Sequence, residues 1–278
     1  MKKAVEILNY ETYLTKMSKT FFDKAWFMSH LPEEINTIVD FGCADGSFLK
    51  FLQINCPSYL YVGIDNDPKM QELCKEKGFK CYSSFREFKE SNCYYSEDTT
   101  CIVLNSVIHE IYSYCQENVI SEIYSFHPKY IAIRDMMFNP IDRTRFYLPL
   151  KDYNNIISLF NEKYPMQFNE FHETWKNKQN YEIEIAHFLL KYIYNNENWS
   201  REVKENYLPI DINEIRNVFC MNTIFPKDNY SIDFQSFYKL PYLVNRWKND
   251  FELDKNFELN EFVRNINTHY KMLLKTEK

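Results

Sequence analysis

Short apolar runs rich in β-branched and aromatic residues alternate with helix-like segments over the first half of the chain. Each run is long enough for one strand, and the segments between the runs have apolar residues at helical spacing. Strands are predicted for the run that ends at Phe41 and for residues 59–65, 80–83, 100–105 and 130–135. Five such β and α units predict an α/β fold, with a parallel sheet and helices on both of its faces.

The second half of the chain is mostly helical in pattern. Residues 153–216 have apolar positions at helix spacing, and β-rich runs follow at 230–238 and 269–275. Sheet elements on both sides of a helical block indicate an insertion into the sheet fold, which we expect to form a lid over an acceptor site. The predicted organisation is an N-terminal helical segment (1–34), a Rossmann-like core (35–140), a helical insertion or lid (141–216) and last strands with a helix that complete the sheet (217–278).

Glycine is scarce, and its positions mark a candidate ligand loop. All four glycines lie between Gly42 and Gly78, and two of them fall in Val39-Asp40-Phe41-Gly42-Cys43-Ala44-Asp45-Gly46, directly behind the first apolar run. A residue without a Cβ lets a loop turn tightly and present bare N–H groups to a ligand at the start of the next helix. The alternative is a strand-turn-helix in which the glycines only serve packing.

An acidic residue ends the second predicted strand. Asp65 follows the glycine loop by about 20 residues, a distance at which a carboxylate can accept hydrogen bonds from both hydroxyls of a ribose. Asn66 comes next and is expected at the adenosine edge. The alternative for Asp65 is an N-cap of the helix that Pro68 opens, and Asp67 is better placed for that role.

The pattern acid-x-Gly-x-small-x-Gly from Asp40 to Gly46 resembles the nucleotide-binding loop of class I S-adenosylmethionine (SAM)-dependent methyltransferases. A dinucleotide-binding Rossmann unit is the nearest alternative, but Ser47 stands where its third glycine packs helix against strand, and Ala44 holds the middle place. The acid before the first glycine is typical of methyltransferases. The resemblance covers residues 35–135 and implies a Rossmann-like class I methyltransferase sheet, here with a helical insertion, and SAM as the cofactor.

The resemblance places the cofactor in the glycine loop and beyond the strands that follow it. The cofactor-binding residues predicted from it are Asp40, Gly42, Cys43, Ala44, Gly46, Asp65, Asn66, Ser84, Phe85, Asn105 and Ser106. Family members commonly have an acid after the third strand that bonds the adenine amino group, whereas this chain has Ser83, Ser84 and Phe85 there. A serine is expected to bond the base edge and Phe85 to stack on it. The alternative for Phe85 is a position in the core.

His109 and Glu110 are the candidates for catalytic proton chemistry. They lie in Asn105-Ser106-Val107-Ile108-His109-Glu110, which resembles a Ser-Val-Leu-His-Glu-like segment of many bacterial SAM methyltransferases. An imidazole can accept a proton from a hydroxyl or amine nucleophile, and Glu110 or a backbone carbonyl is expected to orient it. The alternative for His109 is a structural role in the first turn of a helix. The segment lacks the Asn-Pro-Pro-aromatic motif of many base-methylating enzymes, which argues against a DNA adenine methylase.

Charge favours a small-molecule acceptor over a nucleic acid. The net charge is -6, and no dense Lys/Arg run marks a track for a polyanion. Arg134, Arg143 and Arg145 are expected near the mouth of the site, where they would bind one phosphate or carboxylate. The predicted function is transfer of the SAM methyl group to an O or N atom of an unidentified acceptor. The alternatives are methylation of RNA or another nucleic acid, and a non-catalytic regulatory module that binds SAM or its product S-adenosylhomocysteine (SAH).

Cysteine usage and hydropathy indicate a cytoplasmic protein. The eight cysteines include no Cys-x-x-Cys pair, and several lie in apolar strands. They are therefore interpreted as reduced core residues, and no metal site is predicted. No run approaches the length needed to span a bilayer, so no membrane partner is expected. The oligomeric state is not predicted.

The helical block is crowded with aromatic residues, which have two interpretations. They line an acceptor pocket or a stacking surface, or they fill a core. The residues concerned are Phe168, Phe171, Trp175, Tyr181, Phe188, Tyr192, Tyr194 and Trp199.

Overall fold

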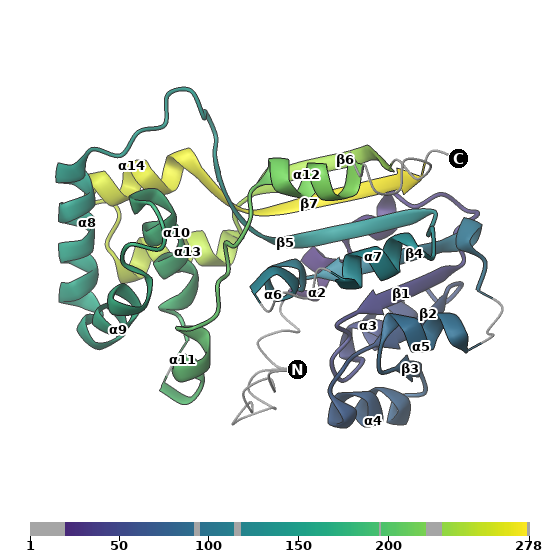
Figure 1. Ribbon diagram of the computed structural model, residues 1–278. Coiled ribbons are helices and arrows are strands. Elements are labelled where there is room, and N and C mark those ends of the chain that lie inside the picture. Colours follow the sequence, from purple (N-terminus) through teal and green to yellow (C-terminus); the bar gives the residue numbers. More distant parts are fainter. Residues whose placement is uncertain (1–19, 92–94, 114–117, 195, 221–229, 277–278) are drawn as a thin grey trace. The chain divides into compact units, whose positions relative to one another are not determined.

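A seven-stranded sheet organises the chain in the computed structural model (Figure 1). The structure describes residues 20–91, 95–113, 118–194, 196–220 and 230–276. The sheet is mixed and has the order β3-β2-β1-β4-β5-β7-β6. Its strands are β1 (Thr37–Phe41), β2 (Leu60–Ile64), β3 (Lys80–Tyr82), β4 (Thr100–Asn105), β5 (Tyr130–Pro140), β6 (Tyr230–Tyr238) and β7 (Ile266–Thr276). The predicted Rossmann-like fold is confirmed, and the two late β-rich runs pair at one edge of the sheet.

The strand order reverses between β1 and β4. β1 pairs in parallel with both β2 and β4, so that Phe41 lies opposite Ile64 on one side and Leu104 on the other. The carboxyl ends of β1 and β4 are therefore neighbours at the switch point, where open α/β sheets bind their ligands. The glycine loop and Asn105 both start at this edge of the sheet.

β5 is longer than the sequence pattern predicted. The expected strand covered residues 130–135, whereas β5 continues to Pro140. Asp135 and Met137 are both 0 % exposed, so every second residue of the strand stays buried beyond the charged residue. A local pattern cannot distinguish a carboxylate buried in mid-strand from one that ends a strand, because the partner of the buried carboxylate is distant in sequence.

Local capping explains where two helices beside the parallel strands begin. The Asp67 carboxylate accepts a hydrogen bond from the Lys69 N–H (2.8 Å), with Pro68 at the first position of α4. The Ser84 hydroxyl accepts one from the Glu87 N–H (3.2 Å) at the start of α5.

The helices that accompany the parallel strands, together with one later helix, are α2 (Phe21–Lys24), η1 (Ala25–Ser29), α3 (Ser47–Asn55), α4 (Pro68–Glu76), α5 (Phe85–Glu90), η2 (Glu97–Thr99), α6 (Ile108–Ser113), α7 (Asn118–Tyr124) and α12 (Ile212–Cys220).

The described residues belong to two compact units. Those within Glu11–Asp135, Ile212–Ser236 and Lys271–Lys278 form a sheet unit, and those within Met136–Asp211 and Phe237–Tyr270 form a helical unit. The helices of the helical unit are α8 (Leu150–Lys163), α9 (Pro165–Trp175), α10 (Tyr181–Lys191), α11 (Asn196–Glu202), α13 (Pro241–Asp250) and α14 (Phe257–Asn265). In the part of the chain that the structure describes, no helix combines the length and the apolar character needed to cross a membrane.

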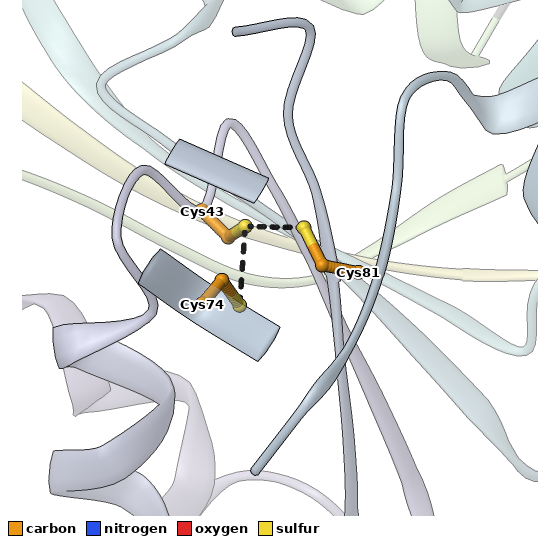
Figure 2. Close-up of side chains that lie close together, drawn as sticks. All are labelled: Cys43, Cys74 and Cys81. Atoms are coloured by element: carbon orange, nitrogen blue, oxygen red, sulfur yellow. Dashed lines mark hydrogen bonds between the residues drawn. The ribbon is translucent and has the colours of Figure 1, made fainter. Parts of the chain in front are cut away.

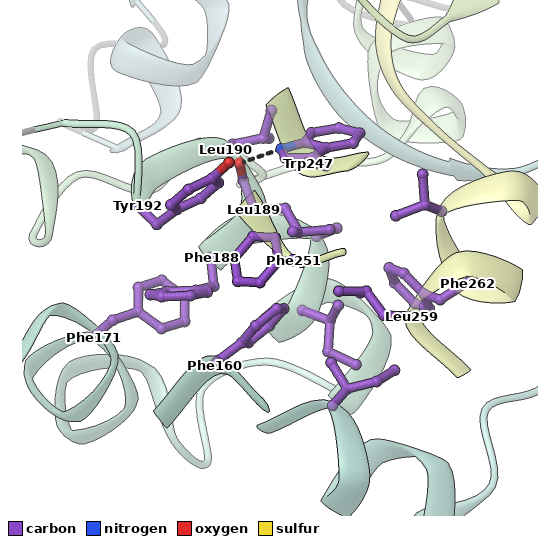
Figure 3. Packing of buried hydrophobic residues seen from close by; sticks show 14 of the residues in the cluster. Phe160, Phe171, Phe188, Leu189, Leu190, Tyr192, Trp247, Phe251, Leu259 and Phe262 are labelled. Atoms are coloured by element: carbon purple, nitrogen blue, oxygen red, sulfur yellow. Dashed lines mark hydrogen bonds between the residues drawn. The ribbon is translucent and has the colours of Figure 1, made fainter. Parts of the chain in front are cut away.

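Aromatic side chains fill the core of the helical unit (Figure 3). The ring centroid of Phe160 lies 4.7 Å from that of Phe188 and 5.1 Å from that of Phe251. The indole N–H of Trp247 donates to the carbonyl of Leu189 (2.9 Å), which satisfies the polar atom of a fully buried side chain. Of the aromatic residues singled out in the sequence, those buried here are Phe168, Phe171, Trp175, Phe188, Tyr192 and Trp199. These six side chains therefore serve the core.

Candidate functional site

The glycine loop joins β1 to α3 and has three residues in the left-handed region. The φ angles are +77° at Gly42, +47° at Ala44 and +75° at Gly46. Ala44 thus adopts a backbone conformation that favours glycine, although this region costs an L-residue about 1–2 kcal/mol. The N–H groups of Gly42 and Cys43 both donate to the Ile64 carbonyl, at 2.8 and 3.1 Å. The loop is therefore fixed across the end of β2.

Asp45 fastens the loop to the helices on either side. Its carboxylate accepts hydrogen bonds from the N–H (3.1 Å) and the hydroxyl (2.7 Å) of Ser47, the first residue of α3. Lys77 forms a 2.8 Å ion pair with the same carboxylate and also donates to the Asp45 carbonyl (2.9 Å). These contacts fasten the loop to α3 and to the C-cap of α4.

Asp65 also contacts the loop directly. One carboxylate oxygen accepts a hydrogen bond from the Ala44 N–H (2.8 Å), and the other accepts one from the Asp67 N–H (3.0 Å). Burial raises the pKa of Asp65 to about 6, while these two N–H donors act to lower it. An ionised carboxylate has about four lone-pair sites. Two hydrogen bonds therefore leave Asp65 with capacity for the hydroxyls of a ribose.

A cavity of about 40 Å³ lies at the switch point beside the loop. It is lined by Phe21, Lys24, Asp40, Gly42, Cys43, Ala44, Asp45, Ser47, Phe48 and Asn105. Asn105 is only 8 % exposed, and neither polar atom of its side chain has a hydrogen-bond partner among the described residues. Because a buried amide without a partner is costly, this asparagine indicates a polar ligand in the cavity.

Two buried groups of opposite charge belong to this cavity's lining. Burial raises the pKa of Asp40 to about 7, and the nearby ammonium of Lys24 opposes that shift. Burial likewise lowers the pKa of Lys24 to about 8, with Asp40 acting in the opposite direction. The cavity therefore offers one acidic and one basic group to a ligand. Lys24 was not predicted from the sequence, because a lysine in a short amphipathic helix is usually exposed.

The remaining predicted cofactor residues lie outside the lining of this cavity. Ser84 caps α5, and Asn66 is exposed. Phe85 is 1 % exposed and packs against Phe88 and Phe126, with ring centroids 5.5 and 5.7 Å away. Ser106 has a φ of +58°, and its hydroxyl accepts a hydrogen bond from Arg134 (2.9 Å). The roles of these four residues, like those of the other predicted cofactor residues, stay predictions.

His109 is held by a buried carboxylate. Its Nδ1 lies 2.7 Å from one Asp135 oxygen, and its backbone N–H donates to the other oxygen (3.1 Å). The two residues are 5 % and 0 % exposed. The sequence led us to expect Glu110 or a backbone carbonyl in this orienting position, but the carboxylate comes from β5, 26 residues further along the chain. Glu110 follows His109 in α6 and is half-buried.

Arg134 is part of an ion-pair cluster in the sheet unit. The Arg134 guanidinium bonds Asp23 at 2.9 Å, and the Lys271 ammonium reaches the other oxygen of the same carboxylate at 2.6 Å. In the helical unit, Arg143 donates to Asn139 (2.9 Å), and Arg145 is an exposed residue. Arg134 is 4 % exposed and already pairs with Asp23. This pairing does not support the expected binding of one anion by all three arginines.

Comparison with known proteins finds solved structures but no family model and no curated protein that matches. The plantazolicin methyltransferase BamL in complex with a triazolic desmethylPZN analog and SAH is 12% identical, with a TM-score of 0.49 over 97% of this chain and 87% of that chain. A SAM dependent methyltransferase from Archaeoglobus fulgidus is 13% identical, with a TM-score of 0.48 over 96% of this chain and 100% of that chain. The MccD protein is 10% identical, with a TM-score of 0.45 over 94% and 99% of the two chains.

Replacing Gly46 with alanine is expected to destabilise the sheet unit more than the same change at Gly78. Both positions have positive φ (+75° and +91°), so both variants carry a backbone cost of about 1–2 kcal/mol. A Cβ at position 46 would also lie 2.7 Å from the Cys74 sulfur, whereas a Cβ at position 78 meets nothing within 4 Å. Overpacking adds about 1–3 kcal/mol. Urea unfolding of both variants measures the difference, and equal losses would show that the loop has room beside Cys74.

Proposed function

We propose that the protein is a SAM-dependent methyltransferase. The observation that carries the proposal is the carboxylate of Asp65, which lies at the end of β2 and is bonded to the Ala44 N–H of a preformed left-handed loop. A carboxylate in this position suits the two hydroxyls of a ribose. The loop lacks the third glycine of a dinucleotide site, since Ser47 stands there. These features support SAM over NAD.

The charged residues of the cavity suit the amino-acid end of SAM, which we place there. SAM carries an α-ammonium and an α-carboxylate, and the cavity has Asp40 and Asn105 as acceptors for the first and Lys24 as a partner for the second. Charge-assisted hydrogen bonds in a buried site are stronger than neutral ones. In this proposal Phe21 and Phe48 supply the apolar part of the lining.

The protein's own contribution to methyl transfer is alignment and proton acceptance. The sulfonium of bound SAM supplies an activated methyl group, so no covalent intermediate with the enzyme is needed. In this proposal His109 carries its proton on Nδ1 and donates it in a hydrogen bond to the Asp135 carboxylate, which fixes the ring. Nε2 is then the basic nitrogen. His109 then accepts a proton from an O or N nucleophile. Glu110 is the second candidate for this role.

The acceptor proposed is a small molecule in the cytoplasm. A net charge of -6 gives no general attraction to a polyanion, which disfavours RNA. A regulatory module that binds SAM or SAH without turnover is the alternative from another class. The buried His109–Asp135 pair favours the enzyme, because a module that only senses the cofactor does not need an oriented base.

Asp65→Ala is expected to weaken SAH binding at least several-fold. Two charge-assisted hydrogen bonds to ribose hydroxyls are lost, and such bonds contribute about 1.5–3 kcal/mol. The matched control is Asp67→Ala, which removes the N-cap of α4 two residues away and should cost about 1 kcal/mol of stability without changing SAH affinity. Calorimetric titration of SAH into the three proteins makes the comparison. Equal affinities would remove Asp65 from the site.

A further inference from the structure

Three cysteines from the glycine loop and two other elements bring their sulfur atoms together (Figure 2). Cys43 lies in the loop, Cys74 in α4 and Cys81 in β3. The Cys43 sulfur is 4.0 Å from that of Cys74 and 3.7 Å from that of Cys81, and all three sulfurs lie within 4.8 Å of one another. The side chains are buried, at 4, 0 and 4 % exposure.

We propose that these three cysteines form a binding site for a thiophilic divalent d¹⁰ metal ion such as Zn²⁺. A zinc ion binds thiolate sulfur at about 2.3 Å, so three sulfurs around one ion are about 3.8 Å apart in tetrahedral and about 4.0 Å apart in trigonal geometry. The separations of 3.7 and 4.0 Å from the Cys43 sulfur match these values, and the third pair of sulfurs lies within 4.8 Å. Each thiol loses its proton on binding, and no electron transfer is involved.

Glycines next to the cluster leave the space that the sulfurs occupy. A Cβ at Gly63 would lie 2.5 Å from the Cys43 sulfur and 3.1 Å from the Cys74 sulfur, and one at Gly46 would lie 2.7 Å from the Cys74 sulfur. Two of the chain's four glycines thus border the cluster. Simple apolar packing does not require three sulfurs to point at one another, because alanine or valine fills such space equally well.

The charge around the cluster favours a divalent cation over a monovalent one. Asp40 interacts electrostatically with Cys43, and Asp65 with Cys81. Three thiolates with one divalent ion leave a single negative charge. A monovalent ion would leave two in the same buried space, which is the costlier arrangement.

A bound ion would tie the glycine loop to α4 and β3 through Cys43. This consequence rests on the proposed function, since it predicts tighter SAH binding when the ion is present. The metal site itself does not depend on SAM. If the metal binds but SAH affinity does not change, the metal site is still supported, and only its proposed effect on cofactor binding is contradicted.

Cd²⁺, which has a thiolate-to-metal absorption in the ultraviolet, is the probe for the test. The reduced full-length protein should bind one equivalent tightly, and Zn²⁺ should compete for it. Cys81→Ser should lower the affinity at least about a hundredfold, because loss of a ligand should cost more than loss of a ligand's hydrogen-bond partner, which costs about 10–100-fold. Cys56→Ser is the control, because Cys56 is half-buried and lies outside the cluster. It should leave the affinity unchanged within about twofold, since it removes no ligand.

A second variant and a second measurement cover the case in which Cys81→Ser does not fold. Gly63→Ala keeps all three thiols but displaces two sulfurs, so it should weaken Cd²⁺ binding more than Gly78→Ala does. X-ray absorption of the zinc-loaded wild-type protein should show three sulfurs at about 2.3 Å. No tight equivalent, a zinc shell without sulfur, or equal losses in Cys81→Ser and Cys56→Ser would each show that the cluster is only packing.

Discussion

His109→Ala is expected to lower methyl transfer by about a hundredfold or more while SAH affinity stays nearly unchanged. The imidazole is placed by the 2.7 Å contact between its Nδ1 and Asp135, and its proposed task is to take the proton of the acceptor. Single-turnover rates with labelled SAM measure the effect once an acceptor fraction has been found. The two readouts together separate loss of a base from loss of the cofactor site.

Asp135→Asn and His30→Ala complete this comparison. Asparagine has only one carbonyl oxygen for the two His109 N–H groups and no charge to stabilise an imidazolium, so turnover should again fall steeply. His30 is an exposed residue at the C-cap of η1 whose ring lies 4.3 Å from that of Phe234, and its loss should leave turnover unchanged. A His109→Ala protein that keeps its turnover, or that unfolds before turnover changes, would place this histidine among the structural residues.

Asp40→Asn is expected to stabilise the protein above neutral pH by up to about 4 kcal/mol and to weaken SAH binding. Burial raises the Asp40 pKa from 3.8 to about 7, so the folded state holds a proton that the unfolded state releases. Stability therefore falls as pH rises between those two values, by about 1.4 kcal/mol for each pH unit. The amide does not titrate, so the variant should lose the part of this pH dependence that Asp40 contributes, while Asp65, whose pKa is raised to about 6, keeps its own part.

The groups around Asp40 set the size of this effect. Lys24 lowers the Asp40 pKa, whereas Asp65 and Cys81 raise it. Lys24 also interacts with Asp23 and Asp135, so it keeps partners of opposite charge in the variant. Urea unfolding at pH 4 and pH 8 measures the difference, with Asp254→Asn as a control at a side chain that is 74% exposed. The same change in stability between pH 4 and pH 8 in wild type and in Asp40→Asn would contradict the assignment.

The parts of the site that were predicted from the sequence are local in the chain. The loop from Asp40 to Gly46 is one short motif, and Asp65 lies at a fixed distance from it. Each apolar run also contains enough residues to define one strand by itself. The sheet and the loop were therefore predictable from spacing alone.

The parts that were missed are contacts between distant segments. The pairing of His109 with Asp135 spans 26 residues, and that of Cys43 with Cys81 spans 38. Lys24 reaches the cavity from a helix before the first strand. No periodicity encodes such contacts, because they depend on which strands become neighbours at the switch point.

The most direct test of the proposed methyltransferase is the formation of SAH from SAM by the purified protein in the presence of cell extract. The extract is separated into a small-molecule and a macromolecular fraction, and SAH is quantified with wild type, Asp65→Ala and His109→Ala. We expect SAH formation that depends on the protein and on the small-molecule fraction, and that falls steeply in both variants. Tight SAH binding without turnover in either fraction would contradict the enzyme and support the regulatory module, and binding of NAD in place of SAH would contradict the cofactor.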